Sequence, residues 1–557
     1  MNTIQPSTRL LRPARRAPSA IWARAPGMAR QLLVPTVAGL AVAYSYFNRI
    51  QTLSFDGANV DLRKWGHLAY SVTAFNGDPS TYYTPLFAYF SNHLRPLLVL
   101  LCLPSSVLPI NIVDNISLIF AAQAFIIVLS ASLLVPALAL PCPALLSRAL
   151  ASVLGLAFFM STPNLAAISY PHFEALFAPL AILFFIASAT GHRVAAALCC
   201  LLLLLVREDL GIHLFAIIAL VVTYELTVNK TPWERLSFIA ICGIISLGYS
   251  LIAGIIQHYF FPGGSDLIHD YLNNPIFSHV TRDFVLGRLQ QFCELRGYLI
   301  LAFFATALIG FYYREPAYLL GYVAFFPWLV FNLLAVKFEP GTLATYHGFP
   351  FILALIWPVV YEVLRGRLFG AVTQDASPVN HHGEVAEGLL SGLANRQTQI
   401  VLATILICFV TTLLEPRSMK ALDWKPAKAE KRHATLVVMN FLAHDLHHEL
   451  KLRVSPSIAA IGLNEIKKKD VVQKGQLLAN GDDASGVIFH RGLNGADAVE
   501  FAKFNGFDRA VRLGSTNIFI AFRGSQRDEI LGALQRTTSG RLRLVEGAFP
   551  EMLLASH

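Results

Sequence analysis

The sequence predicts an all-α, polytopic membrane protein of about eleven transmembrane helices, followed by a small C-terminal α/β domain. Only 14% of the 557 residues are charged and 55% are hydrophobic, whereas soluble domains carry about 25% charged residues. The mean hydropathy is accordingly positive, at +0.53. Apolar runs long enough to cross the hydrocarbon core of a bilayer recur through residues 32–415. Soluble, disordered and fibrous classes are therefore excluded.

The N-terminal arm, residues 1–31, contains six arginines and no acidic residue. Next to a first hydrophobic segment, such an arm is typical of a cytoplasmic anchor under the positive-inside rule. A mitochondrial-type presequence has a similar composition and is the alternative. We expect a multi-pass protein of the bacterial inner membrane, with this arm in the cytoplasm.

The membrane-embedded module covers residues 32–415. Its expected spans are 32–49, 112–137, 148–164, 174–189, 194–206, 210–228, 236–256, 297–313, 316–336, 344–364 and 399–415. Residues 94–109 are too short and too rich in proline for a span, and predict an interfacial or re-entrant helix. An odd number of spans places the long loops 50–93 and 257–296 on the outer face, together with the C-terminal region.

The C-terminal region, residues 416–557, has the composition of a soluble domain and contains none of the seven cysteines. Short β-rich runs alternate in it with helical patterns, which predicts an extracytoplasmic α/β domain without disulfides. The expected strands are 457–463, 486–490 and 517–522, and the expected helices are 436–450 and 495–505.

Ionisable residues collect at the outer ends of the expected spans. An apolar surrounding makes each of them costly, so each is a functional candidate. The first outer loop carries Asp56 and Asp61, and the run SNHLRP at 91–96 carries His93 and Arg95. The remaining candidates are His172 and Glu174 in YPHFE, Arg207, Glu208 and Asp209 in VREDL, and His347 in TYHG.

Five runs around these residues carry a family resemblance. They are VDLRKWGHLAYS (60–71), SNHLRPLL (91–98), YPHFEALFAPL (170–180), LLLVREDLG (203–211) and TYHGFPF (345–351). The runs resemble a bacterial family of predicted membrane proteins of unassigned activity, which is grouped with the GT-C-type integral-membrane glycosyltransferases. The resemblance covers roughly residues 33–415 and 496–523. The chain departs from the pattern at Gly66 and Asn92, where acids are expected, and at Arg207, where lysine is usual.

The resemblance implies transfer of a sugar from a polyprenyl-phosphate-linked donor to an extracytoplasmic acceptor. Asp61 is similar in position to the general base of GT-C enzymes, which takes the proton of the attacking hydroxyl, and Asp56 is a competing base. Arg207, with His93 and Arg95, would hold the lipid phosphate, because a guanidinium binds phosphate oxygens in pairs. An internal ion pair of Arg207 with an adjacent acid is the alternative.

The other candidates, His172, Glu174, Glu208, Asp209 and His347, would bind the substrate. Histidines and carboxylates together also suit a divalent cation, so a cation stays an open alternative for His172, Glu174 and His347. A hydrogen-bonded pair of His172 and Glu174 is the favoured interpretation, and no metal site is assigned.

Two other function classes remain open from the sequence. The same charges would suit a transporter or flippase of a lipid-linked or small polar substrate, and a non-catalytic envelope assembly protein is the third class. The expected partners are membrane lipid, the polyprenyl-phosphate sugar donor, and a glycan, lipid or protein acceptor, but no nucleic acid. The charges collect at one end of the spans, whereas a transporter needs polar groups near the midplane, and this favours an enzyme.

Overall fold

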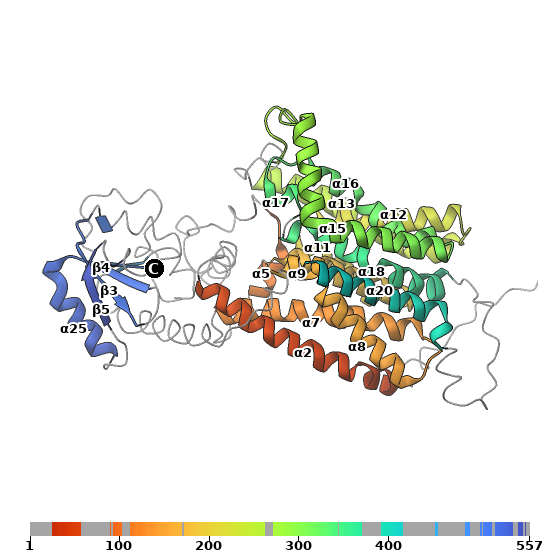
Figure 1. The fold of residues 1–557 in the computed structure, drawn as a ribbon, viewed down its shortest axis with the longest axis horizontal. Coiled ribbons are helices and arrows are strands. Elements are labelled where there is room, and N and C mark those ends of the chain that lie inside the picture. Colours follow the sequence, from red (N-terminus) through yellow and green to blue (C-terminus); the bar gives the residue numbers. More distant parts are fainter. Residues whose placement is uncertain are drawn as a thin grey trace, which may run out of the picture.

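The computed structural model describes residues 25–56, 90, 93–102, 112–169, 172–261, 271–343, 345–369 and 392–415 of the membrane module. In the C-terminal region it describes residues 452–454, 485–490, 502–503, 505–514, 518–538, 544–549 and 552. The membrane module forms a bundle of long helices, and the C-terminal region forms a small sheet with one flanking helix (Figure 1).

The bundle consists of helices that follow the apolar runs of the sequence. They are α2 (Ala25–Asp56), α5 (Pro96–Cys102), α7 (Ile112–Leu138), α8 (Ala144–Met160), α9 (Thr162–Ser169), α10 (Phe177–Ala189), α11 (Arg193–Val206), α12 (Leu210–Thr227), α13 (Trp233–Phe260), α15 (Arg282–Tyr312), α16 (Leu320–Leu333), α17 (Phe338–Gly341), α18 (Phe349–Leu364) and α20 (Arg396–Leu414). Short turns η2 (Phe173–Leu176), η3 (Pro316–Leu319) and η4 (Thr345–Gly348) lead into α10, α16 and α18, and η5 (Arg365–Phe369) follows α18.

The helices support a multi-pass membrane protein. Among the described residues, seven helices are long and apolar enough to cross a membrane, or eight if the bent pair α8 and α9 forms one span. Each expected span overlaps a helix, but the count of eleven is not confirmed. One reason is the length of α10 and α11, which have 13 and 14 residues, fewer than a perpendicular span needs.

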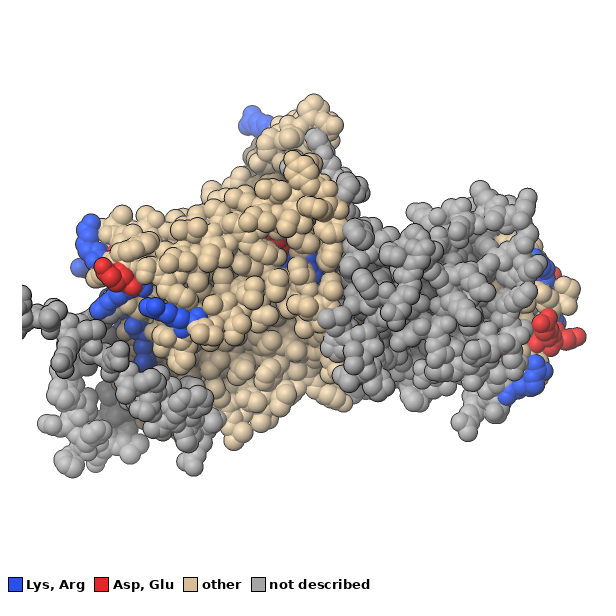
Figure 2. Space-filling view, turned by 180° about the vertical axis from the view of Figure 1, so that it is seen from behind, with Lys and Arg blue, Asp and Glu red and all other residues tan. Residues whose placement is uncertain are grey.

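The surface of the bundle agrees with this conclusion. On the face shown in Figure 2, most of the bundle surface carries neither Lys or Arg nor Asp or Glu, and the charged side chains gather mainly at one end of the bundle. Large apolar side chains are exposed along the outer helices, including Ile244, Leu308 and Phe311. Such a continuous exposed apolar surface is expected where lipid, not water, surrounds the protein.

Helix α18 lies at the centre of the bundle, since every residue from Phe349 to Leu364 is buried. A helix that is apolar on all sides requires such a position. Trp357 at its middle donates a hydrogen bond from Nε1 to the carbonyl oxygen of Ala317 at 3.0 Å. Helices α7 and α8 pack closely at Gly155, where a Cβ atom would lie 2.1 Å from Ser132 Oγ.

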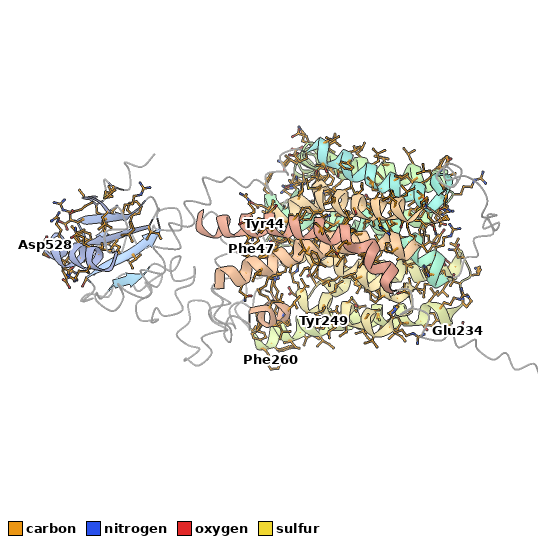
Figure 3. All side chains as sticks on the ribbon, turned by 90° about the horizontal axis from the view of Figure 1, so that it is seen from below. Tyr44, Phe47, Glu234, Tyr249, Phe260 and Asp528 are labelled. Carbon is orange, nitrogen blue, oxygen red and sulfur yellow. The ribbon has the colours of Figure 1, made fainter. Side chains whose placement is uncertain are left out.

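The bundle has two ends, which we name the Glu174 end and the Arg396 end after the charged residues found there. The Tyr46 hydroxyl of α2 donates to the carbonyl oxygen of Ile168 at 2.6 Å, and Thr162 Oγ1 donates to that of Thr411 at 2.6 Å. The C-terminal parts of α2 and α20 therefore both meet α9, at the Glu174 end. Since α20 starts at Arg396, the two ends are separated by the length of a helix, as the labelled ends of α13, Glu234 and Phe260, also show (Figure 3).

Within the described residues, the C-terminal sheet has five strands in the order β1-β2-β4-β3-β5. These are β1 (Leu452–Val454), β2 (Gly486–His490), β3 (Arg509–Leu513), β4 (Ile518–Phe522) and β5 (Leu544–Ala548), with helix α25 (Arg527–Thr538). Strand β2 pairs parallel with β1 and antiparallel with β4. All residues of β4 are buried, and Phe519 packs with Val487 and Phe507 in a small core.

The expected strands at 486–490 and 517–522 match β2 and β4. The segments 457–463 and 436–450 and most of 495–505 lie outside the described residues. Strands β1, β3 and β5 and helix α25 were not expected. In RAVRL of β3 the two arginines interrupt the apolar run, so the sequence alone gives a weak strand signal.

Candidate functional site

Loops that are far apart in the sequence meet at the Glu174 end and bring most of the predicted site residues together. We name this group the Glu174 cluster. Its members are His93 and Arg95 before α5, His172 and Glu174 at η2, Arg207, Glu208 and Asp209 between α11 and α12, and Tyr346 and His347 in η4.

Glu174 is the centre of the cluster and is completely buried. Its Oε1 accepts hydrogen bonds from Arg95 Nη2 at 2.7 Å and from Arg207 Nη1 at 2.8 Å. Its Oε2 lies 2.9 Å from Nδ1 of His172. A buried carboxylate is stable only with such charged partners, so Glu174 fixes the positions of both arginines and is not free to accept a proton itself.

Arg207 is bound on several sides by the chain itself. Its Nε donates to Asp209 Oδ1 at 2.5 Å and its Nη2 donates to Oδ2 of the same residue. The guanidinium also lies over the ring of Phe349, 5.4 Å from its centroid. Burial alone would lower the pKa of Arg207, but the charges of Asp209 and Glu174 raise this pKa well above its usual value. The internal ion pair, left open by the sequence, is thus present with Asp209.

His93 and Glu208 form a second, more accessible pair. Nδ1 of His93 lies 2.8 Å from Oε1 of Glu208. The side chain of His93 is 31% exposed and that of Glu208 is 13% exposed, whereas those of Arg95 and Arg207 are only 4% and 6% exposed. The pair, together with Asp209, whose side chain is 27% exposed, therefore forms the more accessible part of the cluster.

Three aromatic rings stack beside Glu174. The ring of Tyr346 stacks on His172 with centroids 3.6 Å apart, and on His347 with centroids 4.3 Å apart. Trp328 Nε1 donates to the carbonyl oxygen of His347 at 2.9 Å and so holds η4 in place. The structure therefore brings His347 next to His172, as a joint substrate site requires.

Among the described residues, no group of three or more His, Cys, Asp or Glu side chains is arranged to hold a metal ion. His172 instead pairs with Glu174, the arrangement that the sequence favoured over a cation site.

The two candidate bases cannot be placed at the cluster. Asp61 lies outside the described residues, and Asp56 is the last residue of α2, with its side chain outside the described part. Their roles stay predictions from the sequence.

A second ionic group, the Arg396 cluster, lies at the opposite end of the bundle. Its members are Glu225, Glu315, Tyr318, Tyr361, Glu362, Arg365 and Arg396. Glu362 Oε1 accepts from Tyr318 Oη at 2.5 Å and from Arg396 Nη2 at 3.0 Å. Glu225 is fully buried and accepts from Tyr361 Oη at 2.7 Å.

Five residues at the two ends of the bundle were not predicted from the sequence. They are Glu225, Glu315 and Glu362 of the Arg396 cluster, and Tyr346 and Gln123 at the Glu174 end. Gln123 Nε2 donates to the carbonyl oxygen of His172 at 3.1 Å and so supports the Glu174 cluster from α7. A polar residue inside an otherwise apolar run is the signal that would have identified Gln123, whereas Glu225 lies in the last turn of α12.

Comparison of the chain with protein families, curated proteins and solved structures finds no match. The arguments about function therefore rest on the residues of this chain.

Proposed function

We propose that the chain is an integral-membrane glycosyltransferase of GT-C type, which moves a sugar from a polyprenyl-phosphate-linked donor to an extracytoplasmic acceptor. The observation that carries the proposal is the Glu174 cluster, in which two buried arginines stand behind an accessible His–Glu pair at one end of an apolar bundle. Arginines suit the phosphate of a lipid donor, and acids and histidines suit sugar hydroxyls.

The position of the cluster supports a lipid-linked donor. A polyprenyl chain stays in the bilayer, so its phosphate must approach the protein at the membrane surface, where the Glu174 end lies if the bundle spans the bilayer. Arg95 and Arg207, both held by the buried Glu174, would supply positive charge behind this phosphate. Asp61 is the proposed general base, with Asp56 as its competitor.

We further propose a bacterial inner-membrane location with the N-terminal arm in the cytoplasm. The described chain enters the bundle with α2 at the Arg396 end and leaves it after α20 at the Glu174 end. A cytoplasmic arm therefore places the Glu174 cluster and the C-terminal domain on the outer side, where nucleotide sugars are absent and a lipid carrier must supply the sugar.

Transport is the second candidate, and one observation favours it. Charged clusters lie at both ends of the bundle, so polar groups are available on both sides that an alternating-access protein would open to. The central helix α18 argues for the enzyme, because its middle part between Phe351 and Val360 is apolar and completely buried.

The decisive experiment compares the envelope glycans of cells with and without the gene by mass spectrometry. A glycosyltransferase predicts the loss of one defined sugar from a glycan, lipid or protein, and accumulation of its polyprenyl-phosphate donor. Unchanged glycans together with an unchanged donor pool would overturn the proposal. Accumulation of a donor on the cytoplasmic side only would instead favour the flippase.

A further inference from the structure

The contact between His93 and Glu208 has no role in the proposed function so far. Glu208 Oε1 holds Nδ1 of His93 at 2.8 Å, while Nε2 of His93 takes part in no hydrogen bond within the described part of the chain. When one ring nitrogen is held by a carboxylate, the other nitrogen is fixed in direction and can exchange a proton with a ligand.

Glu208 is bound differently from the other acids of the bundle. Glu174 and Glu225 use both carboxylate oxygens in hydrogen bonds, at opposite ends of the molecule. Glu208 Oε2 is buried and has no hydrogen-bond partner among the described residues. A buried oxygen without a hydrogen-bond partner lowers the stability of the fold. If Glu208 served only to stabilise the fold, its Oε2 would be expected to accept a hydrogen bond. We therefore interpret Glu208 as the residue that holds the ring of His93 in position.

Charged and titratable groups from two elements lie close to His93. They are Glu208 and Asp209, from the turn between α11 and α12, and His347 from η4. His172 and His347 are almost completely buried, so His93 is the histidine of the cluster that a donor can reach.

Resting on the proposed function, we propose that His93 is the general acid for the leaving polyprenyl phosphate and that Glu208 is its positioning residue. The acceptor oxygen forms a bond to the anomeric carbon and loses its proton to the base. The bond from the anomeric carbon to the phosphate oxygen breaks, and its electron pair stays on that oxygen. Nε2 of His93 gives its proton to this oxygen, so polyprenyl phosphate leaves as a monoanion.

The arginines of the cluster cannot take over this step. Arginine stays protonated in proteins, so Arg95 and Arg207 stabilise charge but do not release a proton. They also remain bound to the buried Glu174. The proposal therefore assigns the transferred proton to His93, the more exposed histidine among the described residues of the cluster.

The test uses the full-length protein in detergent, with undecaprenyl-phosphate glucose, mannose or arabinose as the donor and a total envelope extract as the acceptor. Release of undecaprenyl phosphate is measured for the wild type, His93→Gln, His93→Gly, Glu208→Gln and Glu208→Asp. His192→Gln is the matched control, since His192 is exposed and pairs with Thr190 at the other end of the bundle.

We expect His93→Gln to lower kcat about 10²–10⁴-fold with little change in KM, which is the usual contribution of a general acid. Glu208→Gln should lower kcat about tenfold or more, and Glu208→Asp should restore part of it, because a carboxylate again holds the ring. Added imidazole should rescue His93→Gly, and this rescue should weaken as the pH rises above about 6.5, where imidazole loses its proton.

Rescue that instead grows with pH would make His93 a base, and absence of rescue with an unchanged kcat in His93→Gln would remove it from catalysis. Either result overturns the inference while the wild type still releases undecaprenyl phosphate. A wild type that releases none from any of the three donors would count against the proposed function itself.

Discussion

The Glu174 cluster and the Arg396 cluster lie at opposite ends of the same bundle and are both built from buried acids and arginines. They differ in how completely their polar atoms are satisfied. Within the described residues, no side-chain atom of Glu225, Glu315, Glu362 or Arg396 is buried without a hydrogen-bond partner, whereas Glu208 Oε2 is.

The partners of the acids differ as well. Glu225 is held by the neutral groups of Tyr361, Asn229 and Thr231, which close the end of the bundle around it. Glu174 is held by two arginines and a histidine, next to a pair that is open to ligands. A closed network of neutral donors stabilises the fold, while charged groups with unused hydrogen-bonding capacity mark a functional site.

The first prediction concerns which end of the bundle faces outward. The thiol labelling that it predicts is all or none. In a cysteine-free background, Asp528→Cys in the C-terminal domain should react with a membrane-impermeant thiol reagent added to spheroplasts, while Glu234→Cys at the Arg396 end should not. Both positions are exposed, so access alone decides the outcome (Figure 3). Labelling of Glu234→Cys before permeabilisation, with protection of Asp528→Cys, would reverse the orientation.

The second prediction concerns the base that should complete the Glu174 end. Asp61→Asn keeps the size of the side chain but cannot accept the proton of the acceptor, so transfer should fall about 10²–10⁴-fold with donor binding retained. Asp56→Asn should be milder. Transfer is measured for both variants in detergent, with membrane abundance as the control. Near-normal transfer by Asp61→Asn beside an inactive Asp56→Asn would move the base five residues upstream.

The third prediction concerns stability at the Glu174 end. Glu174→Gln removes the charge that Arg95 and Arg207 share, so each buried guanidinium loses one ion pair, although Arg207 keeps its pair with Asp209. Breaking a buried ion pair in this way costs about 3–5 kcal/mol of unfolding free energy. Unfolding in a denaturing-detergent titration measures the change, and a loss below about 1 kcal/mol would show that water or lipid reaches the arginines.

The fourth prediction is the matched control at the other end. Glu225→Gln makes the same substitution at an equally buried acid, but its partners are neutral and an amide oxygen still accepts from Tyr361. The loss of unfolding free energy should be about 1 kcal/mol, and transfer should be unchanged. A loss equal to that of Glu174→Gln, or a loss of transfer, would remove the distinction between the two ends.

Much of the fold could be predicted from the sequence because membrane helices leave a strong one-dimensional signal. Each apolar run of the membrane module coincides with a helix, since a bilayer requires backbone groups to be satisfied within the segment. Polar residues between the runs had to lie at the bundle ends. The exact number of spans could not be predicted in this way, because α10 and α11 are short and their crossing depends on tilt and packing.

The pairing of the site residues was decided only by the tertiary structure. Arg95 and Arg207 are 79 and 33 positions from Glu174, and no periodicity relates them. The same holds for Glu225 and Tyr361, which are 136 positions apart. Hydropathy tells which residues must avoid lipid, but the order in which helices pack determines which polar groups meet. The sequence therefore determined where the charges lie along the chain, and packing around the buried helix α18 decided which of them became partners.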